Sequence, residues 1–425
     1  MNFSKQQLII IFSVIGIVLF FVLVFLGVIP GLRKDNSGKG GPFDNTEKIQ
    51  ISFWGVDEAS NIELILDAYS KINQSVNISY TQFNESNYEK SLVNSLASGQ
   101  GPDILMFNNS WLPKHSDKIA FASETQINLK KIRQIFPAVV EQDCVSENKI
   151  YCLPIYIDTL AFIYNKDHFD SKGIAVLPTN WQNFQSIISR LRETDSGNKI
   201  IKAAAAIGGS NKSIDSASDL LSLIMLQSED NPPSSPDAFN FYLQFSNPSS
   251  QYYTWNDNLR PSLDNFSQET TSAIFNYASS LKSILSKNPS LNLAVSPMLQ
   301  FNEKKPINYP RYWALAVSKQ SKNSKLAWDF IISASTNSTI AKTYLQTSKN
   351  PPALRSLIQE YINDPDIGIF ASQALTAKNW QQKDNTAIKG IISNMIESVL
   401  NGKLSPAKSI QEAENAINQL WRKLF

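Results

Sequence analysis

The chain is long, moderately apolar and close to neutral. It has 425 residues, of which 42% are hydrophobic; this is too long for one ordinary core and predicts two globular domains. Lys and Arg number 39 against 37 Asp and Glu, a net charge of +2, so nothing indicates a nucleic-acid partner. The eight tryptophans and fourteen tyrosines are a better clue, because such rings form stacking platforms in binding clefts.

The N-terminal segment is apolar enough to cross a membrane. Leu8 to Ile29 is a run of 22 residues without a charge, long enough to span a bilayer as a helix. It exceeds the apolar region of a secretory signal and ends without an Ala-x-Ala pattern, and no cysteine nearby supports a lipoprotein anchor. We therefore expect residues 1–32 to form a retained transmembrane anchor rather than a cleaved signal. Residues 33–46, rich in glycine and polar residues, read as a flexible tether.

Strands and helices alternate at the start of the body. The hydrophobic periodicity predicts strands at 48–54, 76–82 and 104–107 and helices at 57–72 and 88–97. This order predicts a parallel sheet covered by helices. Ligands of open α/β sheets bind beyond the carboxyl ends of the strands, which here are Trp54-Gly55 and Asn108 to Trp111. Asp103, just before the third strand, is better explained as a helix or turn cap than as a ligand contact. For Trp111, packing beneath Pro113 at a helix start is an equal alternative to binding.

The two cysteines are Cys144 and Cys152. Glu147-Asn148-Lys149 reads as a turn between two short extended arms, so the sulfurs lie across a hairpin and pair with plausible geometry. An exported chain makes a disulfide chemically sensible. Two buried thiols or a metal pair are the alternatives, although two thiols do not complete a zinc site and neither histidine has a matching spacing. We hypothesise a disulfide.

The stretch from Tyr151 to Asp170 organises the chain. Pro154 disfavours a helix before it, and residues 160–164 predict an interior strand that ends in a turn at 165–167. Asp158 stands between two extended segments, flanked by Tyr156 and Tyr164. An acid in this setting is unusual for a plain core and is typical of a hinge lined with ligand-facing groups.

Strands and helices are again predicted to alternate in the rest of the chain. We expect a helix capped by Thr179 and continuing to Arg192, and a surface hairpin at 252–256. Further strands are predicted at 201–207, 272–277, 291–298 and 313–317, and further helices at 217–227, 237–245, 324–333, 388–400 and 406–420.

Several of these segments resemble the extracellular solute-binding proteins that serve sugar ABC transporters, of the maltose-binding-protein type. The matching motifs run from Lys48 to the C-terminus: Gly101-Pro102-Asp103 before a strand, Leu153-Pro154, Tyr164-Asn165-Lys166-Asp167, and the Ala327-Trp328-x-Phe330 signature. The resemblance implies a two-lobed periplasmic-binding-protein-like α/β fold (type II) with three crossings, near Asp158, Tyr312 and Pro352. It assigns residues 47–157 and 313–352 to the first lobe and residues 158–312 and 353–425 to the second.

The resemblance also implies a ligand site between the lobes. Relatives contact sugar with the residues after the third strand, with an aromatic at the end of the first strand, and with rings near the second crossing. The corresponding ligand-binding residues are Trp54, Asn108, Asn109, Trp111, Tyr156, Asp158, Tyr277, Tyr312, Trp313 and Trp380. The chain departs from the pattern at Ser110, where some sugar binders have aspartate, and at Glu269-Thr270, where glycine is usual; both departures put the identity of the sugar in doubt.

The predicted function is that of a membrane-anchored extracytoplasmic binding protein of an ABC transporter, which captures a sugar or oligosaccharide and delivers it to a permease. We expect a monomer. We also expect no metal, cofactor or catalytic residue, because no Gly-x-Ser-x-Gly elbow, phosphate loop or His-Glu-x-x-His motif occurs. The alternatives are an anchored glycoside hydrolase, in which Asp57 and Asp158 would be the paired acids, and a carbohydrate receptor without a transport role.

Overall fold

The computed structural model describes residues 48–228 and 232–422. The predicted anchor, Leu8–Ile29, and the tether at 33–46 lie outside the described residues. Within the described ranges, no helix is both long and apolar enough to cross a membrane.

Two sets of buried side chains divide the described chain into two lobes. The first core draws on residues 51–157 and 312–374. The second lobe is built around two further clusters, drawn from residues 160–309, Phe370 and residues 388–417. The first core thus extends past residue 352. We propose that the last passage into the second lobe lies at 377–384 rather than at 352–353.

The first lobe is built on a sheet whose strand order is β2-β1-β3-β15-β4. β1 pairs in parallel with β2 and β3, which confirms the parallel sheet expected from the sequence. β15 arrives from the second lobe and runs antiparallel to β3. The strands are β1 (Ile49–Gly55), β2 (Val76–Gln82), β3 (Ile104–Asn108), β4 (Ile119–Ala120), β7 (Leu153–Pro154) and β15 (Trp313–Ser318).

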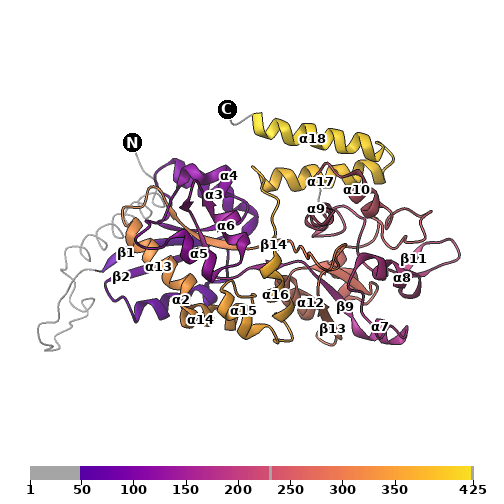
Figure 1. The fold of residues 1–425 in the computed structure, drawn as a ribbon, viewed down its shortest axis with the longest axis horizontal. Coiled ribbons are helices and arrows are strands. Elements are labelled where there is room, and N and C mark those ends of the chain that lie inside the picture. Colours follow the sequence, from indigo (N-terminus) through magenta and orange to yellow (C-terminus); the bar gives the residue numbers. More distant parts are fainter. Residues whose placement is uncertain (1–47, 229–231, 423–425) are drawn as a thin grey trace, which may run out of the picture. The chain divides into compact units, whose positions relative to one another are not determined.

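Helices cover this sheet, and segments far apart in sequence meet on it. α14 packs beside α2, whose stripe of Ile62, Ile65 and Tyr69 is buried, and Figure 1 shows this pair together below the sheet. The helices of this lobe are α2 (Ala59–Ser70), α3 (Glu85–Ala97), α4 (Leu112–His115), η1 (Ser116–Lys118), α5 (Leu129–Ile135), α6 (Ala138–Cys144), α13 (Ser324–Thr336), α14 (Ser338–Ser348) and α15 (Arg355–Tyr361).

Asp103 holds neighbouring segments of the first lobe together. Its carboxylate accepts hydrogen bonds from the backbone N–H and the hydroxyl of Ser52, both at 2.9 Å, and from the hydroxyl of Ser321 at 2.6 Å. It therefore has a structural role, as expected, although it ties β1 to the loop after β15 instead of capping its own turn.

Three extended segments lie side by side at the junction of the lobes. β8 (Asp158–Thr159) pairs antiparallel with β14 (Pro310–Arg311). The segment around Pro352 runs along the same strip, because the backbone N–H of Ile157 donates to the carbonyl of Pro351 at 3.0 Å. The resemblance implied these three segments, and the structure brings them into contact.

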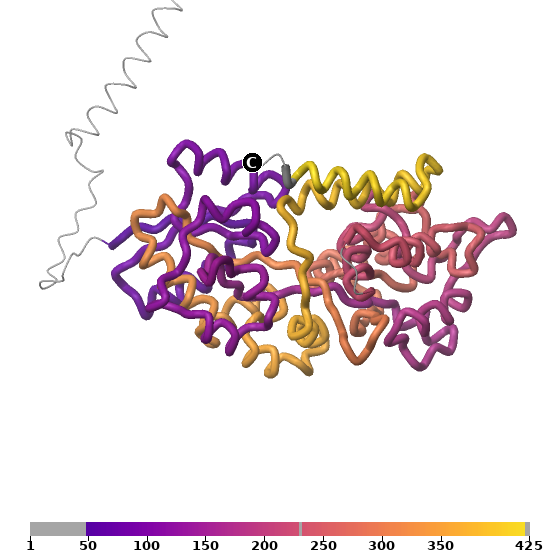
Figure 2. Tube along the Cα trace, turned by 45° about the horizontal axis from the view of Figure 1, so that its top comes forward, coloured from indigo at the N-terminus to yellow at the C-terminus, as the bar shows by residue number. Residues whose placement is uncertain are grey.

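The second lobe is built on a smaller sheet, in the order β12-β9-β13 with antiparallel pairing. The C-terminal helices α17 and α18 pack against each other and contact α9 and α10. Figure 2 shows them in yellow along this lobe. The strands are β9 (Ala161–Asn165), β10 (Glu193–Thr194), β11 (Ile200–Lys202), β12 (Ala273–Asn276) and β13 (Leu293–Ser296). The helices are α7 (Lys166–Ser171), α8 (Trp181–Leu191), α9 (Ala217–Gln227), α10 (Pro236–Leu243), α11 (Ser262–Ser267), η2 (Ala278–Ser280), α12 (Leu281–Lys287), α17 (Asn385–Leu400) and α18 (Pro406–Arg422). α16 (Gly368–Gln373) and η3 (Ala374–Thr376) precede the linker and lie at the junction, where α16 contacts both α15 and β8.

Three local predictions in this lobe are wrong. The turn expected at 165–167 is the start of α7, because the Asn165 side chain caps that helix. The cap of α8 is Asn180, not Thr179. The expected surface hairpin at 252–256 is instead internal: the Thr254 hydroxyl accepts the backbone N–H of Ala204, and the Trp255 ring is fully buried. Alternating aromatics there reflect packing on two sides.

The linker 377–384 is held to the first lobe by polar contacts. The Gln142 amide donates to the carbonyl of Asn379 at 2.7 Å, and the Gln381 amide donates to the carbonyl of Gln142 at 2.6 Å. At the end of the linker, Asp384 accepts the backbone N–H of Ala387 and caps α17. Its other carboxylate oxygen lies 2.7 Å from the Lys114 ammonium of α4, which also pairs with Glu89 at 2.7 Å.

The predicted disulfide is confirmed. Cys144 and Cys152 are bonded at 2.00 Å. β5 (Val145–Ser146) and β6 (Lys149–Ile150) form the two arms between them, with Glu147 and Asn148 in the left-handed region at the turn. The bond closes α6 onto the strand that leads to the first crossing.

Replacing both Cys144 and Cys152 with serine should lower the urea midpoint of unfolding of the first lobe. Opening a loop of this size costs about 2–3 kcal/mol on the chain-entropy estimate. Circular dichroism of residues 43–425 with and without reductant measures the effect. Reductant should shift the wild-type midpoint and leave that of the double-serine variant unchanged; equal midpoints for all samples would contradict the prediction.

Candidate functional site

Aromatic rings gather where the strands of the first sheet end. Trp111, the N-cap residue of α4, packs edge-on against Trp313 with ring centroids 5.1 Å apart. Beneath them the buried Tyr88 hydroxyl lies 3.0 Å from the carbonyl oxygen of Trp54 and 3.1 Å from that of Met106. Tyr88 thus bridges the carboxyl ends of β1 and β3. The rings stand on a fixed base at the edge where α/β sheets bind ligands.

Two of these rings remain partly exposed. Trp54 is the last residue but one of β1 and lies against Phe83 with centroids 4.7 Å apart. Trp313 begins β15 and is also half-exposed, whereas Trp111 is buried. Asn108, half-exposed beside them, accepts the backbone N–H and the hydroxyl of Ser110 through its side-chain carbonyl. Trp54, Trp313 and the amide nitrogen of Asn108 are therefore the groups of this edge that a ligand can reach.

A second cluster lies next to the crossings. The ring of Tyr156 stacks on Tyr344 at 5.9 Å, and the Tyr344 hydroxyl donates to Asp57 at 2.6 Å. Burial raises the pKa of Asp57 to about 6, partly opposed by that hydrogen bond and reinforced by Glu85 and Glu58. The sequence predicted Tyr156 as a site residue but gave no sign of Tyr344.

Asp158 is deeply buried and nearly saturated by backbone donors. It is 2% exposed and accepts the backbone N–H groups of Thr159, Ala278 and Ser279, each at 2.9 Å. Burial raises the pKa of Asp158 against these hydrogen bonds. The carboxylate thus anchors the turn after β12 to the first crossing, which leaves little of it for a ligand hydroxyl.

Arg311 is the charged residue of the junction that the sequence reasoning missed. Its guanidinium lies over the ring of Tyr277, 4.4 Å from the centroid, and it is exposed while its neighbours Pro310 and Tyr312 are buried. The Tyr277 hydroxyl in turn donates to Asp219 at 2.9 Å, and Asp219 pairs with Lys389 at 3.2 Å. The alternation of exposure along this extended segment was readable in the sequence; its position between the lobes was not.

A buried polar centre joins three segments beside the disulfide. Asp143 accepts hydrogen bonds from the amides of Asn109 and Asn379 at 3.0 and 3.1 Å and from the Tyr312 hydroxyl at 2.9 Å. Burial raises the pKa of Asp143 to about 7, against the lowering effect of these three donors. Asn109 and Tyr312, both predicted to bind ligand, therefore use their polar groups inside the protein.

A pocket of about 340 Å³ opens beside this centre. It lies between the loop after β3, the β5–β6 hairpin and the linker, and its lining includes Asn109, Ser110, Asp143, Asn379 and Gln382. The side-chain oxygen of Gln382, Oε1, is buried there without a hydrogen-bond partner among the described residues.

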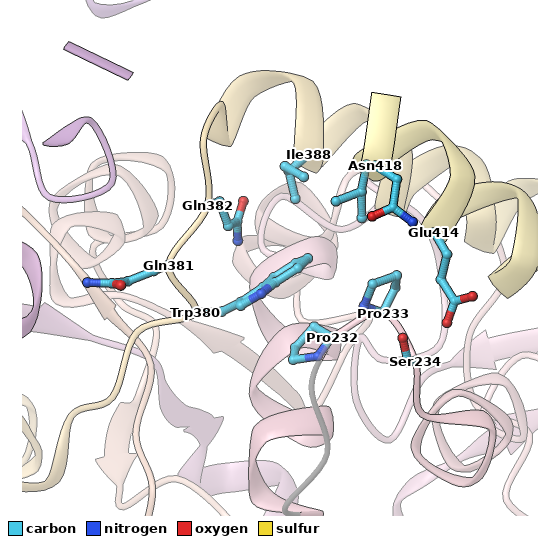
Figure 3. Close-up of a pocket in the computed structure, with 10 residues that line it drawn as sticks. Pro232, Pro233, Ser234, Trp380, Gln381, Gln382, Ile388, Glu414 and Asn418 are labelled. Atoms are coloured by element: carbon cyan, nitrogen blue, oxygen red, sulfur yellow. The ribbon is translucent and has the colours of Figure 1, made fainter. Parts of the chain in front are cut away.

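Trp380 lies apart from the other predicted rings. It occupies a pocket of the second lobe with Pro232, Pro233, Ile388 and Glu414, and Figure 3 shows its ring pointing into that pocket beneath α17 and α18. None of the other nine predicted ligand residues lines it. The structure thus gathers Trp54, Asn108, Trp111 and Trp313 at the sheet edge and Tyr156, Asp158 and Tyr277 at the crossings, and leaves Trp380 elsewhere.

No group of three or more His, Cys, Asp or Glu side chains in the described ranges is arranged to hold a metal ion. The chemistry available at the junction is therefore that of rings, amides, hydroxyls and paired charges, which suits recognition of a polar solute.

Asp143 should make the protein less stable as the pH rises from about 4 to 7. Its pKa is raised from 3.8 to about 7 on folding, so the folded state holds a proton that the unfolded state has lost, and stability is lost with rising pH by up to about 4 kcal/mol. Comparing the urea midpoints of wild type and Asp143→Asn at several pH values isolates this contribution, because the variant does not titrate there.

Glu89 is the matched control for that measurement. Its hydrogen bond to His115, followed by those from Lys114, lowers the pKa of Glu89 from 4.5 to about 2, so its contribution is present above pH 4.5 and is lost on acidification. The wild-type advantage over Glu89→Gln should grow from about pH 2 to 4.5 and then stay level, and that over Asp143→Asn should shrink from about pH 4 to 7. The same trend in both variants would contradict the assignment for Asp143.

Comparisons with known proteins agree with this architecture. A family model described as bacterial extracellular solute-binding protein matches residues 65–369. The fold is similar to an ABC substrate-binding protein from Listeria monocytogenes solved with cycloalternan, with a TM-score of 0.71 and 16% identity over 88% of this chain and 99% of that one. It is also similar to the sugar-binding protein MalE of Xanthomonas citri and to the cyclic alpha-maltosyl-1,6-maltose binding protein of Arthrobacter globiformis. Both give a TM-score of 0.72 and 16% identity over 88% of this chain and 98% of theirs. The chain belongs to the bacterial extracellular solute-binding proteins.

Proposed function

We propose that the chain is the binding subunit of an ABC transporter and captures a sugar or oligosaccharide between its two lobes. The observation that carries the proposal is the pair of half-exposed rings, Trp54 and Trp313, at the strand ends of the first lobe. Trp313 lies two residues beyond Arg311, whose guanidinium lies over the ring of Tyr277 of the second lobe. Aromatic rings cover the apolar faces of a pyranose, while placed polar groups bind its hydroxyls.

Related structures support a carbohydrate ligand. One relative was solved with cycloalternan and another, a cyclo/maltodextrin-binding protein with 14% identity and a TM-score of 0.69, with maltotetraose. The conformational step follows from the crossing strands β8 and β14, which lie side by side, and from the linker 377–384, because extended segments at a junction absorb the backbone rotation of a hinge. Closure about Asp158, Tyr312 and this linker would trap the ligand.

The remaining parts of the proposal concern the cell surface. The segment Leu8–Ile29 would anchor the protein in the membrane, with the two lobes outside the cytoplasm. The closed form would then present a surface to the transmembrane subunits of the permease. Reconstitution with a candidate permease tests this step: ligand-loaded protein should stimulate its ATPase, and a receptor without a transport role would not.

Removing either exposed ring should weaken sugar binding. Trp54→Ala and Trp313→Ala each lose a stacking face worth about 1–2 kcal/mol, so the Kd for a bound oligosaccharide should rise about 5- to 30-fold. Isothermal titration of residues 43–425 with maltotetraose and a panel of neutral oligosaccharides measures this. Phe121→Ala, a 48% exposed ring that packs on Tyr151 instead, is the control and should leave the Kd unchanged. Equal affinities for all four proteins would remove the rings from the site.

The pure protein should release its ligand unchanged. Paired acids for glycoside cleavage need one free carboxylate and one free carboxylic acid, and Asp158 is engaged by three backbone donors. Incubation of the protein with each oligosaccharide that it binds, followed by mass spectrometry, checks this. Any shortened product that scales with protein concentration, and disappears in Asp57→Asn, would favour the hydrolase instead.

A further inference from the structure

Arg311 stands at the centre of the junction on the side that faces solvent. Its strand β14 pairs with β8, which places Arg311 opposite Asp158. Arg311 and Trp313 are two residues apart in an extended segment, so their side chains lie on the same side, whereas Tyr312 between them points to Asp143. The guanidinium and the half-exposed ring of Trp313 therefore belong to one surface.

The guanidinium is held in a fixed orientation. Its support is the ring of Tyr277, which is fully buried and is itself held by the hydrogen bond from its hydroxyl to Asp219. One nitrogen of Arg311 donates to the Ser279 hydroxyl at 3.3 Å. Stacking on a rigid ring removes much of the freedom that a long side chain otherwise loses on binding. The arrangement is preorganised.

Most donors of this guanidinium have no partner among the residues that the structure describes. Arginine carries five N–H groups in a planar fork, and the bond to Ser279 is the one hydrogen bond that Arg311 makes within the described ranges. No carboxylate of the described chain lies within 4.0 Å of it. Asp158, its neighbour across the strand pair, is taken up by three backbone N–H groups. Arg311, and not Asp158, is the polar group free to hold a ligand.

The surrounding charge favours a neutral ligand over an anion. Burial tends to lower the pKa of Arg311, but Tyr277, Asp219, Asp158 and Glu85 together outweigh it and raise the pKa. Arg311 is thus exposed to solvent while these four groups lie around it. Asp57 and Glu58, just before α2, add further negative charge beside Glu85, of which Lys282 offsets part by pairing with Glu58 at 2.7 Å. These carboxylates would repel an anionic ligand. They would not repel a neutral hydroxylated ring.

We propose that Arg311 is a specificity-determining residue, whose fork donates two parallel hydrogen bonds to a pair of adjacent oxygens on a neutral pyranose. The two N–H groups on one edge of a guanidinium match two acceptor oxygens held side by side, as vicinal hydroxyls are. The ring of that sugar would stack on Trp313 or Trp54. This inference rests on the proposed function and names the group that reads the sugar within it.

The test compares Arg311→Met, Arg311→Lys and Arg260→Met by isothermal titration of residues 43–425. The neutral probes are maltotetraose and the same panel of neutral oligosaccharides, and trigalacturonate is the acidic probe. For the neutral sugar that binds best, Arg311→Met should raise the Kd about 10- to 100-fold, and Arg311→Lys should recover less than half of that loss on a logarithmic scale, because lysine has the charge but not the fork. Arg260→Met, which removes an exposed arginine of the second lobe, should leave the Kd within about twofold of the wild type. Trigalacturonate should bind the wild type at least about tenfold more weakly than the neutral sugar.

A second measurement separates contact with the ligand from a structural role. Monodeoxy analogues of the bound sugar remove one hydroxyl at a time. One analogue should lose about tenfold in affinity for the wild type and lose nothing for Arg311→Met. If Arg311 only balances the charge of Asp158 and Asp219, Arg311→Met will lower the thermal midpoint and every analogue will lose equally in both proteins.

The outcomes distinguish the two levels of the argument. If the wild type and Arg311→Met bind the neutral sugar with the same Kd, the role of Arg311 is overturned and the proposed function stands. A wild type that prefers trigalacturonate overturns the neutral ligand class. If the wild type binds neither trigalacturonate nor any neutral oligosaccharide of the panel, the proposed function and this inference are overturned together.

Discussion

The buried carboxylate of Asp158, together with the pairing of β8 with β14, is the constraint on which the junction depends. Two short strands alone would give few hydrogen bonds. The Asp158 carboxylate accepts three further hydrogen bonds. Two of them come from the backbone N–H groups of Ala278 and Ser279, in η2 just after β12. Because a buried carboxylate without such donors is costly, the crossing and the turn after β12 have to move as one unit. Tyr277, which precedes Ala278 and Ser279, belongs to the same unit and carries the guanidinium of Arg311 over its ring.

Periodicity predicted the start of the first lobe well, because β1, β2 and β3 pair with neighbours in sequence. The spacing of Ile51 and Phe53 on β1, and of Ile62, Ile65 and Tyr69 on α2, gave strand and helix correctly, and their alternation gave the parallel order. The cysteine hairpin was predictable for the same reason, since both sulfurs and the turn lie within one short segment. Local signals of this kind need no knowledge of the rest of the fold.

The site was harder to predict because its contacts join distant segments. Burial of Asp158 followed from its apolar neighbours, but two of its three donors come from more than a hundred residues away. Tyr312 and Asn109 were recognised as polar groups near the junction, yet both are directed to Asp143, which no sequence motif marked. Trp380 illustrates the converse, since a ring in the right part of the chain points into a pocket of the second lobe. Resemblance locates a segment, whereas the direction of each side chain depends on the packing around it.

One carboxylate at the end of the linker serves two functions at once. Asp384 caps α17 through one oxygen and reaches Lys114 of the first lobe through the other. The cap is a short-range hydrogen bond within the second lobe, whereas the contact with Lys114 is an ion pair that dissolved salt screens. Ionic strength therefore acts as an external control on this link between the lobes: added salt loosens it while the helix keeps its cap, so the tendency of the two halves to separate varies with the medium.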